Sequence, residues 1–500
     1  MRAIDRWAIQ ERGISSLDLM ERAGVAVTRT LEQLLPDGPV AVVCGSGNNG
    51  GDGLVVARLL RNAGRAVSVI CTRPHADLSG DARVNLERLP GEPPLQPDDQ
   101  GRLDFSGLAH AGVILDALLG TGFEGQPRGH VAEAIKEINA SQALVLSVDI
   151  PSGVDASSGV VASEAVAATA TVTFHASKPG LWIHPGKALA GSVVVADIGI
   201  PRNPPAATDI GLIAGKILDL VPRRRADSTK FSSGHVLVAG GSRDLTGAPR
   251  MSAQAAMRAG AGYVTALVPA SLQPILASAS RPELMTRGLP ESEGAFGKGA
   301  AAEALQLCRP GGSLVLGPGI GTGQDAGSFA RELAREAPCA LVLDADGLGA
   351  HADALGGLAG RNNPTVLTPH TGELGRLLGL ERRQIEAERL LHVRAAAKEA
   401  GSVVLLKGDD TLIADPSGLV AVSPGGSPGL ATAGTGDVLS GVIAALLAKN
   451  LDAFTAACAG VWMHLRAGRE AARRIGGADG VIASDVIDAL PAMLNDGNRA

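Results

Sequence analysis

Short apolar runs alternate with amphipathic segments along the whole chain. The runs are rich in valine, isoleucine and leucine with few polar positions, as strands buried on both faces are. In the first part of the chain they cover residues 39–45, 66–72, 112–120, 143–150, 171–174 and 192–198. Further along they cover residues 235–241, 313–319, 340–347, 365–369, 402–408 and 411–415. Helical periodicity marks the segments between them, for example residues 52–64, 130–140, 249–260 and 436–450.

This alternation predicts an α/β protein with parallel sheets, because parallel strands are joined by helical crossovers. A chain of 500 residues exceeds what one hydrophobic core usually serves. A proline-rich loop at residues 201–207 and a basic, polar stretch at residues 223–234 separate the two sets of runs. We therefore predict two domains, residues 1–212 and 213–500, each binding ligands at the carboxyl ends of its strands.

Composition narrows the classes of function. Aromatic residues make up 2% of the chain and the formal net charge is −6, which argues against nucleic acid as a partner. We interpret the one basic run, Arg223–Arg225, as a solvated segment. The five cysteines are scattered without CxxC spacing, which indicates buried, reduced thiols. Neither a signal peptide nor a membrane span is evident, so we expect a cytoplasmic protein without a membrane partner.

Polar residues follow three predicted strands of the first domain. One group lies in the glycine-rich loop 45–53, which opens a helix whose unpaired N–H groups suit an anionic ligand. Two aspartates, Asp116 and Asp149, stand at the ends of the next strands. A buried carboxylate there needs a cation, a donor or a chemical role, although each aspartate alone could also cap a helix. Together these oxygen-rich groups suit a hard cation.

Five motifs stand out in this half: LMERAG (19–24), GSGNNGGDG (45–53), DALLGTGFEG (116–125), DIPSGVD (149–155) and SKPGL (177–181). With these motifs, residues 1–200 resemble the NAD(P)H-hydrate epimerase family, also called the YjeF N-terminal domain. The resemblance implies a Rossmann-like three-layer sandwich. It implies that Asp149 handles the proton with Lys178 as helper, and that Asn49, Asp116 and Ser152 hold a potassium ion. The substrate-binding residues that it implies are Asn48, Asn49, Gly50, Gly51, Asp52, Gly120, Thr121, Gly122, Phe123, Glu124, Gly125, Gln126 and Asp149.

A second constellation lies in the C-terminal half. The segment ATAGTGDVLSG (431–441) opens an apolar helix, whose first N–H groups would cradle a phosphoryl group. Asp437 stands where it could take a proton from a substrate hydroxyl. Lys407–Thr411 follows a predicted strand and would suit a nucleotide, with a simple hairpin turn as the rival interpretation. His370 also stands at a strand end, before a helix start.

With GPGIG (317–321), DADGL (344–348) and TPHTGEL (368–374), these motifs resemble the ADP- or ATP-dependent NAD(P)H-hydrate dehydratase family. The resemblance covers about residues 225–490 and implies a ribokinase-like three-layer sandwich, with Mg²⁺ on the nucleotide phosphates. It implies Asp437 as the catalytic residue and Gly319, His370 and Asp437 as substrate-binding residues. The nucleotide-binding residues that it implies are Lys407, Gly408, Asp409, Asp410, Thr411 and Gly436. Three residues depart from the family pattern, namely Thr229, Leu245 and Ser427, and ADP or ATP preference stays open.

The combined prediction is a bifunctional enzyme that repairs hydrated NADH and NADPH. The first domain would interconvert the R and S hydrates, and the second would dehydrate the S hydrate with an adenine nucleotide. One alternative keeps the C-terminal domain as a small-molecule kinase, for instance for a vitamin-precursor alcohol, beside a nucleotide-binding N-terminal domain. Another is a regulatory protein with degenerate sites, which would have lost its catalytic aspartates. We also expect a homo-oligomer.

Overall fold

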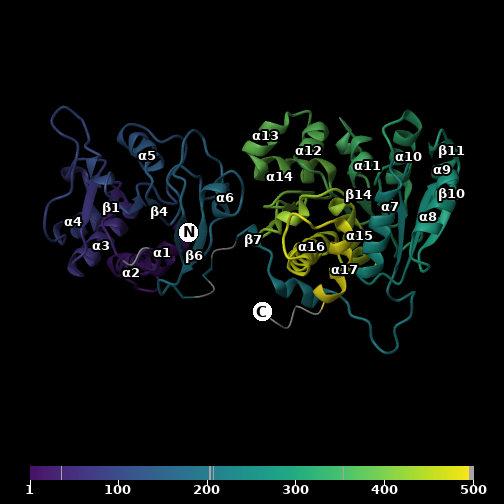
Figure 1. The fold of residues 1–500 in the computed structure, drawn as a ribbon, viewed down its shortest axis with the longest axis horizontal. Coiled ribbons are helices and arrows are strands. Elements are labelled where there is room, and N and C mark those ends of the chain that lie inside the picture. Colours follow the sequence, from purple (N-terminus) through teal and green to yellow (C-terminus); the bar gives the residue numbers. More distant parts are fainter. Residues whose placement is uncertain (35–36, 202–203, 206–207, 353, 495–500) are drawn as a thin grey trace. The chain divides into compact units, whose positions relative to one another are not determined.

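The computed structural model describes residues 1–34, 37–201, 204–205, 208–352 and 354–494. It divides into two compact units, Met1–Thr208 and Asp209–Ala500 (Figure 1). We predicted the boundary at residue 212. The structure divides the chain earlier because strand β7 (Ile210–Leu212) pairs with β18 (Val420–Val422) of the second sheet. The proline-rich loop of the prediction lies partly outside the described residues.

The first unit is built on a six-stranded sheet in the order β2-β1-β3-β4-β5-β6, in which every pairing is parallel. Alternate residues of β1 enter two different cores: Val40 and Val42 pack on one face of the sheet, Ala41 and Val43 on the other. The strands are β1 (Val40–Cys44), β2 (Val67–Cys71), β3 (Val113–Ala117), β4 (Leu144–Val148), β5 (Ala170–Phe174) and β6 (Ser192–Ala196).

Helices cover both faces of this sheet, which makes three layers. Helices α1, α2 and α3 contribute Trp7, Leu31 and Leu54 to the core on one face, and α5 contributes Ile135 to the core on the other. The helices are α1 (Arg2–Gln10), α2 (Ser16–Leu34), α3 (Asn48–Asn62), α4 (Gly80–Glu87), α5 (His130–Ala140) and α6 (Gly186–Leu189).

The second unit holds a ten-stranded sheet in the order β10-β9-β8-β13-β14-β15-β16-β17-β18-β7. The pairings from β10 to β16 are parallel, whereas β17 pairs antiparallel with both β16 and β18. The remaining strands are β8 (His235–Ala239), β9 (Tyr263–Pro269), β10 (Met285–Leu289), β13 (Ser313–Leu316), β14 (Ala340–Leu343), β15 (Thr365–Leu367), β16 (Val403–Leu406) and β17 (Leu412–Ala414), with a separate hairpin of β11 (Glu291–Ser292) and β12 (Ala295–Phe296).

The largest core of this unit lies between the sheet and helices α7, α15, α16 and α17. Helix α15 is the most deeply enclosed, with almost every residue after its first turn buried. Gly441 lets α15 approach α7 closely, because a side chain there would collide with the Ser252 carbonyl oxygen. The helices are α7 (Gly247–Arg258), α8 (Gln273–Ala279), α9 (Ala300–Leu307), α10 (Gln324–Glu336), α11 (Ala345–Gly349), α12 (Thr371–Leu378), α13 (Arg382–Ala387), α14 (Arg389–Ala400), α15 (Thr435–Leu447), α16 (Ala453–Ile475) and α17 (Ala483–Met493).

The prediction of two α/β units with parallel sheets is confirmed, and each apolar run of the sequence contains a strand. Strands β7, β9, β10 and β18 and the hairpin of β11 and β12 were missed, as was the antiparallel pairing of β17. The five cysteines are buried and free of disulfides, as predicted. Within the described parts of the chain, no helix combines the length and apolarity needed to cross a membrane.

Candidate active sites

The glycine-rich loop of the first unit is folded tightly against neighbouring backbone. Helix α3 begins at Asn48, after Gly47. A side chain at Gly50 would collide with the Gly45 carbonyl oxygen, and one at Gly51 would lie 2.6 Å from the terminal carbon of Met20. Gly50 and Gly51 are therefore buried packing positions. The loop presents to ligands the side chains of the residues beside these two glycines.

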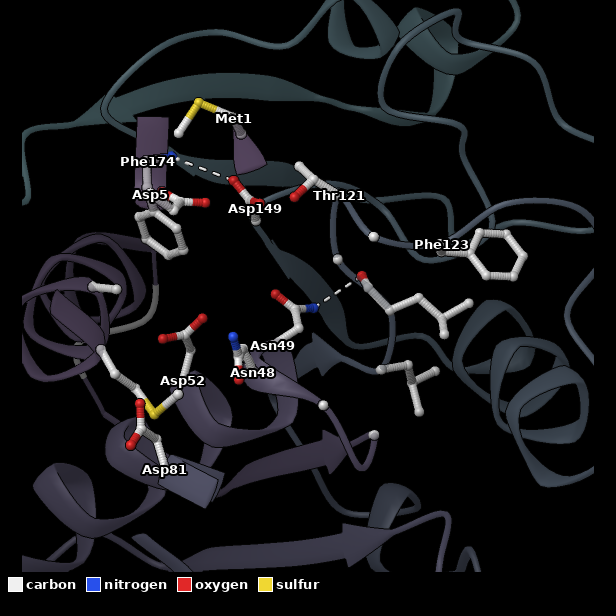
Figure 2. A pocket seen from close by; sticks show the side chains of 18 of the residues that line it. Met1, Asp5, Asn48, Asn49, Asp52, Asp81, Thr121, Phe123, Asp149 and Phe174 are labelled. Atoms are coloured by element: carbon white, nitrogen blue, oxygen red, sulfur yellow. Dashed lines mark hydrogen bonds between the residues drawn. The ribbon is translucent and has the colours of Figure 1, made fainter. Parts of the chain in front are cut away.

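Those neighbours open onto a cavity of about 610 Å³ at the carboxyl ends of the strands (Figure 2). Asn48, Asn49 and Asp52, which belong to the predicted substrate-binding set, line this cavity. Asn49 donates a hydrogen bond from Nδ2 to the Leu119 carbonyl oxygen at 2.9 Å, and Figure 2 draws this bond. The amide is thereby oriented, and the loop after β1 is tied to the loop after β3.

The loop after β3 contributes only its first half to the cavity. Gly120, Thr121, Gly122 and Phe123 are among the lining residues. Glu124, Gly125 and Gln126 are exposed and do not belong to that lining. The structure thus brings Gly120–Phe123 to the predicted site, while Glu124–Gln126 extend beyond it into solvent.

Beneath the cavity, the fully buried Asp116 forms the centre of a hydrogen-bonded network. Its Oδ2 accepts from Ser147 Oγ at 2.8 Å and from the Ser152 backbone N–H at 2.9 Å. Its Oδ1 accepts from Ser152 Oγ at 2.6 Å, and Ser152 Oγ in turn accepts from the Leu119 N–H at 2.9 Å. Burial raises the pKa of Asp116, although these hydrogen bonds oppose the shift.

Asp149 and Lys178 form a second polar pair, which does line the cavity. Lys178 Nζ lies 2.6 Å from Asp149 Oδ1, and it also donates to Thr173 Oγ1 at 2.8 Å and to the Phe174 carbonyl at 2.9 Å. Oδ1 additionally accepts from Thr173 Oγ1 and the Phe174 N–H. Because the hydrogen bonds that the Asp149 carboxylate accepts from the described residues all fall on Oδ1, its Oδ2 stays available to a ligand.

The backbone at Asp149 is unusual. Its φ of 66° lies in the left-handed region, which aspartate tolerates better than most residues. This conformation comes directly after β4, and the Asp149 N–H bonds to the Val172 carbonyl at 2.7 Å. Such strain is held by the surrounding structure and is characteristic of functional positions.

The carboxylates of this cavity influence one another. Burial raises the pKa of Asp52 well above its usual range, and the charges of Asp149 and Asp5 add to that shift. Burial also raises the pKa of Asp5, which reaches the cavity from α1 (Figure 2). An aspartate that favours its protonated form beside Asp149 is an arrangement suited to acid–base chemistry.

In the second unit the predicted catalytic residue lies in a charged cluster. Helix α15 begins after Gly434, whose φ of 86° is left-handed, and Asp437 lies in its first turn. Asp344, at the end of β14, accepts from Lys407 Nζ at 2.9 Å and from Ser440 Oγ at 2.6 Å. The strand ends of β14 and β16 are thereby bound to the start of α15.

The charges in this cluster shift two carboxyl groups in opposite directions. Burial raises the pKa of Asp437 to about 7, with the charge of Asp344 adding to the shift and that of Lys407 opposing it. At Asp344 burial also acts upward, but Lys407 and the hydrogen bonds from Ser440 and Lys407 prevail and lower its pKa. Asp437 is thus poised to gain or lose a proton near neutral pH.

His370 is placed by a helix start. Its Nδ1 accepts from the Gly372 and Glu373 N–H groups at 3.0 and 3.2 Å, and Glu373 Oε2 accepts from the His370 N–H at 2.8 Å. This reciprocal cap opens α12. Burial lowers the pKa of His370, so its neutral, hydrogen-bond-accepting form is favoured. Glu373 Oε2 also lies 3.8 Å from Lys407 Nζ, which connects His370 to the cluster.

The predicted nucleotide-binding loop divides into two kinds of residue. Lys407 faces the charged cluster, and a side chain at Gly436 would lie 3.5 Å from its Nζ. Asp410, by contrast, is buried in an ion pair with Arg389, at 2.8 Å between Oδ2 and Nε. Thr411 Oγ1 donates to the Gly408 carbonyl at 2.6 Å and closes the turn. Asp410 and Thr411 therefore shape this loop, while Gly408 and Asp409 are its exposed positions.

Gly319 and the three atypical residues lie in varied places. Gly319 has a left-handed φ of 67°, and a side chain there would lie 2.8 Å from Leu245 Cβ. Leu245 is 47% exposed, so it flanks Gly319 without filling a core. Thr229 exchanges hydrogen bonds with Ser232 in an exposed turn, and Ser427 accepts from the Gly429 N–H.

Sequence reasoning missed several residues that the structure brings to these sites. Asp344 and Ser440 stand inside motifs already quoted, and the rule that a buried acid at a strand end needs a partner could have found Asp344. Asp5, Arg73 and Asp81 line the first cavity from segments that gave no motif. Only the packing of α1, α4 and the loop after β2 around the cavity reveals them.

Both halves of the chain match known protein families. Residues 16–180 match the family model described as YjeF-related protein N-terminus, and residues 236–492 match the model described as NAD(P)H-hydrate dehydratase. A bifunctional NAD(P)H-hydrate repair enzyme Nnr of Moorella thermoacetica is 41% identical, with 99% of this chain and 96% of that protein covered. Its counterpart from Coxiella burnetii is 38% identical, with 99% and 98% covered.

Among solved structures, an ADP/ATP-dependent NAD(P)H-hydrate dehydratase from Bacillus subtilis, co-crystallised with ATP and Mg²⁺, is similar to part of the chain. It is 25% identical, with a TM-score of 0.49, and the match covers 58% of this chain and all of that one.

Proposed function

The chain belongs to the family of bifunctional NAD(P)H-hydrate repair enzymes, and on this premise we propose how its two units divide the repair. The first unit interconverts the R and S hydrates of NADH and NADPH. The second unit removes water from the S hydrate at the expense of an adenine nucleotide. Together they return both hydrates to the working cofactor.

In the first unit, the Asp149–Lys178 pair supports the epimerase proposal. Epimerisation passes through a flat, partly cationic ring, so it needs a carboxylate close to the ring and a group that moves a proton. Asp149 has Oδ2 available, while Lys178 holds Oδ1 at 2.6 Å and fixes the carboxylate in place. Asp52, whose pKa is raised by burial, is a candidate proton donor across the same cavity.

Potassium remains part of this proposal. The donors that would hold it are Asn49, Asp116 and Ser152. Asn49 and Ser152 both bond to the backbone of Leu119, and Ser152 Oγ donates to Asp116 Oδ1. Hydroxyl, amide and carboxylate oxygens fit a hard monovalent cation. The ion would contribute positive charge to this site.

In the second unit, the start of α15 supports phosphoryl transfer. Its unpaired N–H groups, preceded by the left-handed Gly434, would stabilise the negative charge of a transferring phosphoryl group. Asp437 takes the proton from the added hydroxyl of the substrate, which becomes phosphorylated and is then eliminated. Lys407 is held by Asp344 where it can meet nucleotide phosphates.

Magnesium is proposed with the nucleotide. Among the described residues, no group of three or more His, Cys, Asp or Glu side chains could enclose a metal ion. This fits Mg²⁺ that arrives on phosphates and keeps several waters, because such an ion needs only one or two protein carboxylates. Asp346 is the candidate carboxylate. We also propose a cytoplasmic location, a homo-oligomeric state and a separate functional domain for each activity.

The observation that carries the assignment is the presence of both aspartates, Asp149 and Asp437, in intact polar sites on one chain. We would follow absorbance at the reduced-nicotinamide band with mixed hydrates of NADH, Mg²⁺ and ADP or ATP. Full recovery is expected for the natural chain. Asp149→Ala should limit recovery to the S fraction, and Asp437→Ala should abolish it. Nucleotide consumption with another alcohol, without NADH recovery, would instead indicate a small-molecule kinase.

A further inference from the structure

Arg73 holds a distinctive place at the first site. It follows β2 by two residues and lines the same cavity as Asp149. Arg73 and Lys178 are the two cationic side chains among the described lining residues, and Lys178 is already bound to Asp149. Arg73 is exposed and forms no hydrogen bond or ion pair with any residue that the structure describes. Its charge is therefore free for a ligand.

Nearby arginines of this unit are engaged elsewhere. Arg58 pairs with Glu21, Arg61 donates to the carbonyls of Pro90 and Glu92, and Arg83 pairs with Glu87. Each of these side chains has a structural partner. Arg73 has no such partner among the described residues, and it differs from the exposed Arg88 of the same unit in lining the cavity.

The order of groups across the sheet edge matches the order of parts in a dinucleotide. Asp149 follows β4, the helix start at Asn48 follows β1, and Arg73 follows β2, in a sheet ordered β2-β1-β3-β4. From β4 to β2 there are three strand spacings, about 14 Å. A nicotinamide at Asp149 would place its pyrophosphate over the start of α3 and its adenosine ribose at the end of β2.

Resting on the proposed epimerase function, we infer that Arg73 binds the 2′-phosphate of hydrated NADPH. In nucleotide-binding sheets of this kind, the end of the second strand meets the adenosine ribose: an acid there binds the 2′-hydroxyl, and an arginine accommodates a 2′-phosphate. Guanidinium binds a phosphate dianion through paired, charge-assisted hydrogen bonds. The first unit therefore epimerises hydrated NADPH in preference to hydrated NADH.

The test measures interconversion of purified R and S hydrates by chromatography, with the full chain and without adenine nucleotide, so that dehydration does not proceed. Rates of the uncatalysed reaction are subtracted. Arg73→Gln should lower kcat/KM for hydrated NADPH about tenfold or more, the effect of losing a charged hydrogen bond. The value for hydrated NADH should stay within about twofold.

Arg88→Gln is the matched control, because Arg88 is exposed on the same unit and lies outside the cavity lining. It should change neither value. Equal losses on both hydrates after Arg73→Gln, or no loss on either, would overturn the inference. A natural chain that interconverts neither hydrate would instead remove the proposed function and this inference with it, a result that no Arg73 variant can mimic.

Discussion

The proton affinity of Asp437 predicts how the dehydratase activity depends on pH. Burial and the charge of Asp344 raise the pKa of this carboxyl to about 7. A base acts only in its ionised form, and about one-tenth of Asp437 is ionised at pH 6 against about nine-tenths at pH 8. We therefore expect kcat/KM for the S hydrate to rise about tenfold between these pH values, with a midpoint near 7.

The variant Asp344→Asn distinguishes the titration of Asp437 from that of other groups. The variant removes the largest electrostatic contribution that raises the pKa of Asp437, and it frees Lys407 to interact with Asp437. The midpoint should therefore move to lower pH. The terminal phosphate of the nucleotide also titrates in this range, but it does so identically for both proteins, so the difference between them reports on Asp437 alone.

The assay is NADH recovery from the purified S hydrate at saturating nucleotide and Mg²⁺, between pH 5.5 and 8.5, with blanks for spontaneous decay of the substrate. Circular dichroism at each pH establishes that both proteins stay folded. A flat profile for the natural chain, or a midpoint that rises in Asp344→Asn, would refute Asp437 as the base.

Three further predictions concern other parts of the two units. Asp149→Asn keeps the shape of the side chain and tolerates the left-handed backbone, so it should abolish use of the R hydrate while S-hydrate recovery continues; a retained R-hydrate rate would contradict the proposed role. Arg389→Met leaves the Asp410 carboxylate buried without its partner, which should destabilise the second unit by about 3–5 kcal/mol. Calorimetry should show a lower melting temperature for one of two transitions. An unchanged transition would refute the importance of the ion pair. Gly50→Ala brings a methyl group into the Gly45 carbonyl, so it should lower the melting transition of the first unit and weaken epimerisation; a fully active, equally stable variant would show that the loop can move.

Much of both sites could be predicted from the sequence because their residues lie at strand ends. Asp116 lies near the end of β3, Asn49 and Asp149 come after β1 and β4, and parallel strands bring such positions to one edge. The role of Asp410 could not be predicted in this way. Its partner Arg389 lies 21 positions away on α14 and carries no motif, so the buried pair emerges only when the helix packs on the sheet.

Two residues that line the first cavity could not be predicted from the sequence either. Asp5 and Arg73 stand in segments whose patterns indicate only a helix and a loop. Their place in the lining of the cavity depends on how α1 and the end of β2 pack, which is a property of tertiary structure. Glu124–Gln126 show the reverse case, because a contiguous motif continues past the point where the chain leaves the cavity.

The close contact between α15 and α7 at Gly441 has a consequence for turnover. A helix enclosed on nearly every side, with its backbone against another helix, has no room to shift when a ligand arrives. The proposed phosphoryl-binding groups would consequently be in place before the nucleotide binds, and binding energy would not be consumed in assembling them. Any closure during the catalytic cycle would therefore have to come from the surrounding loops.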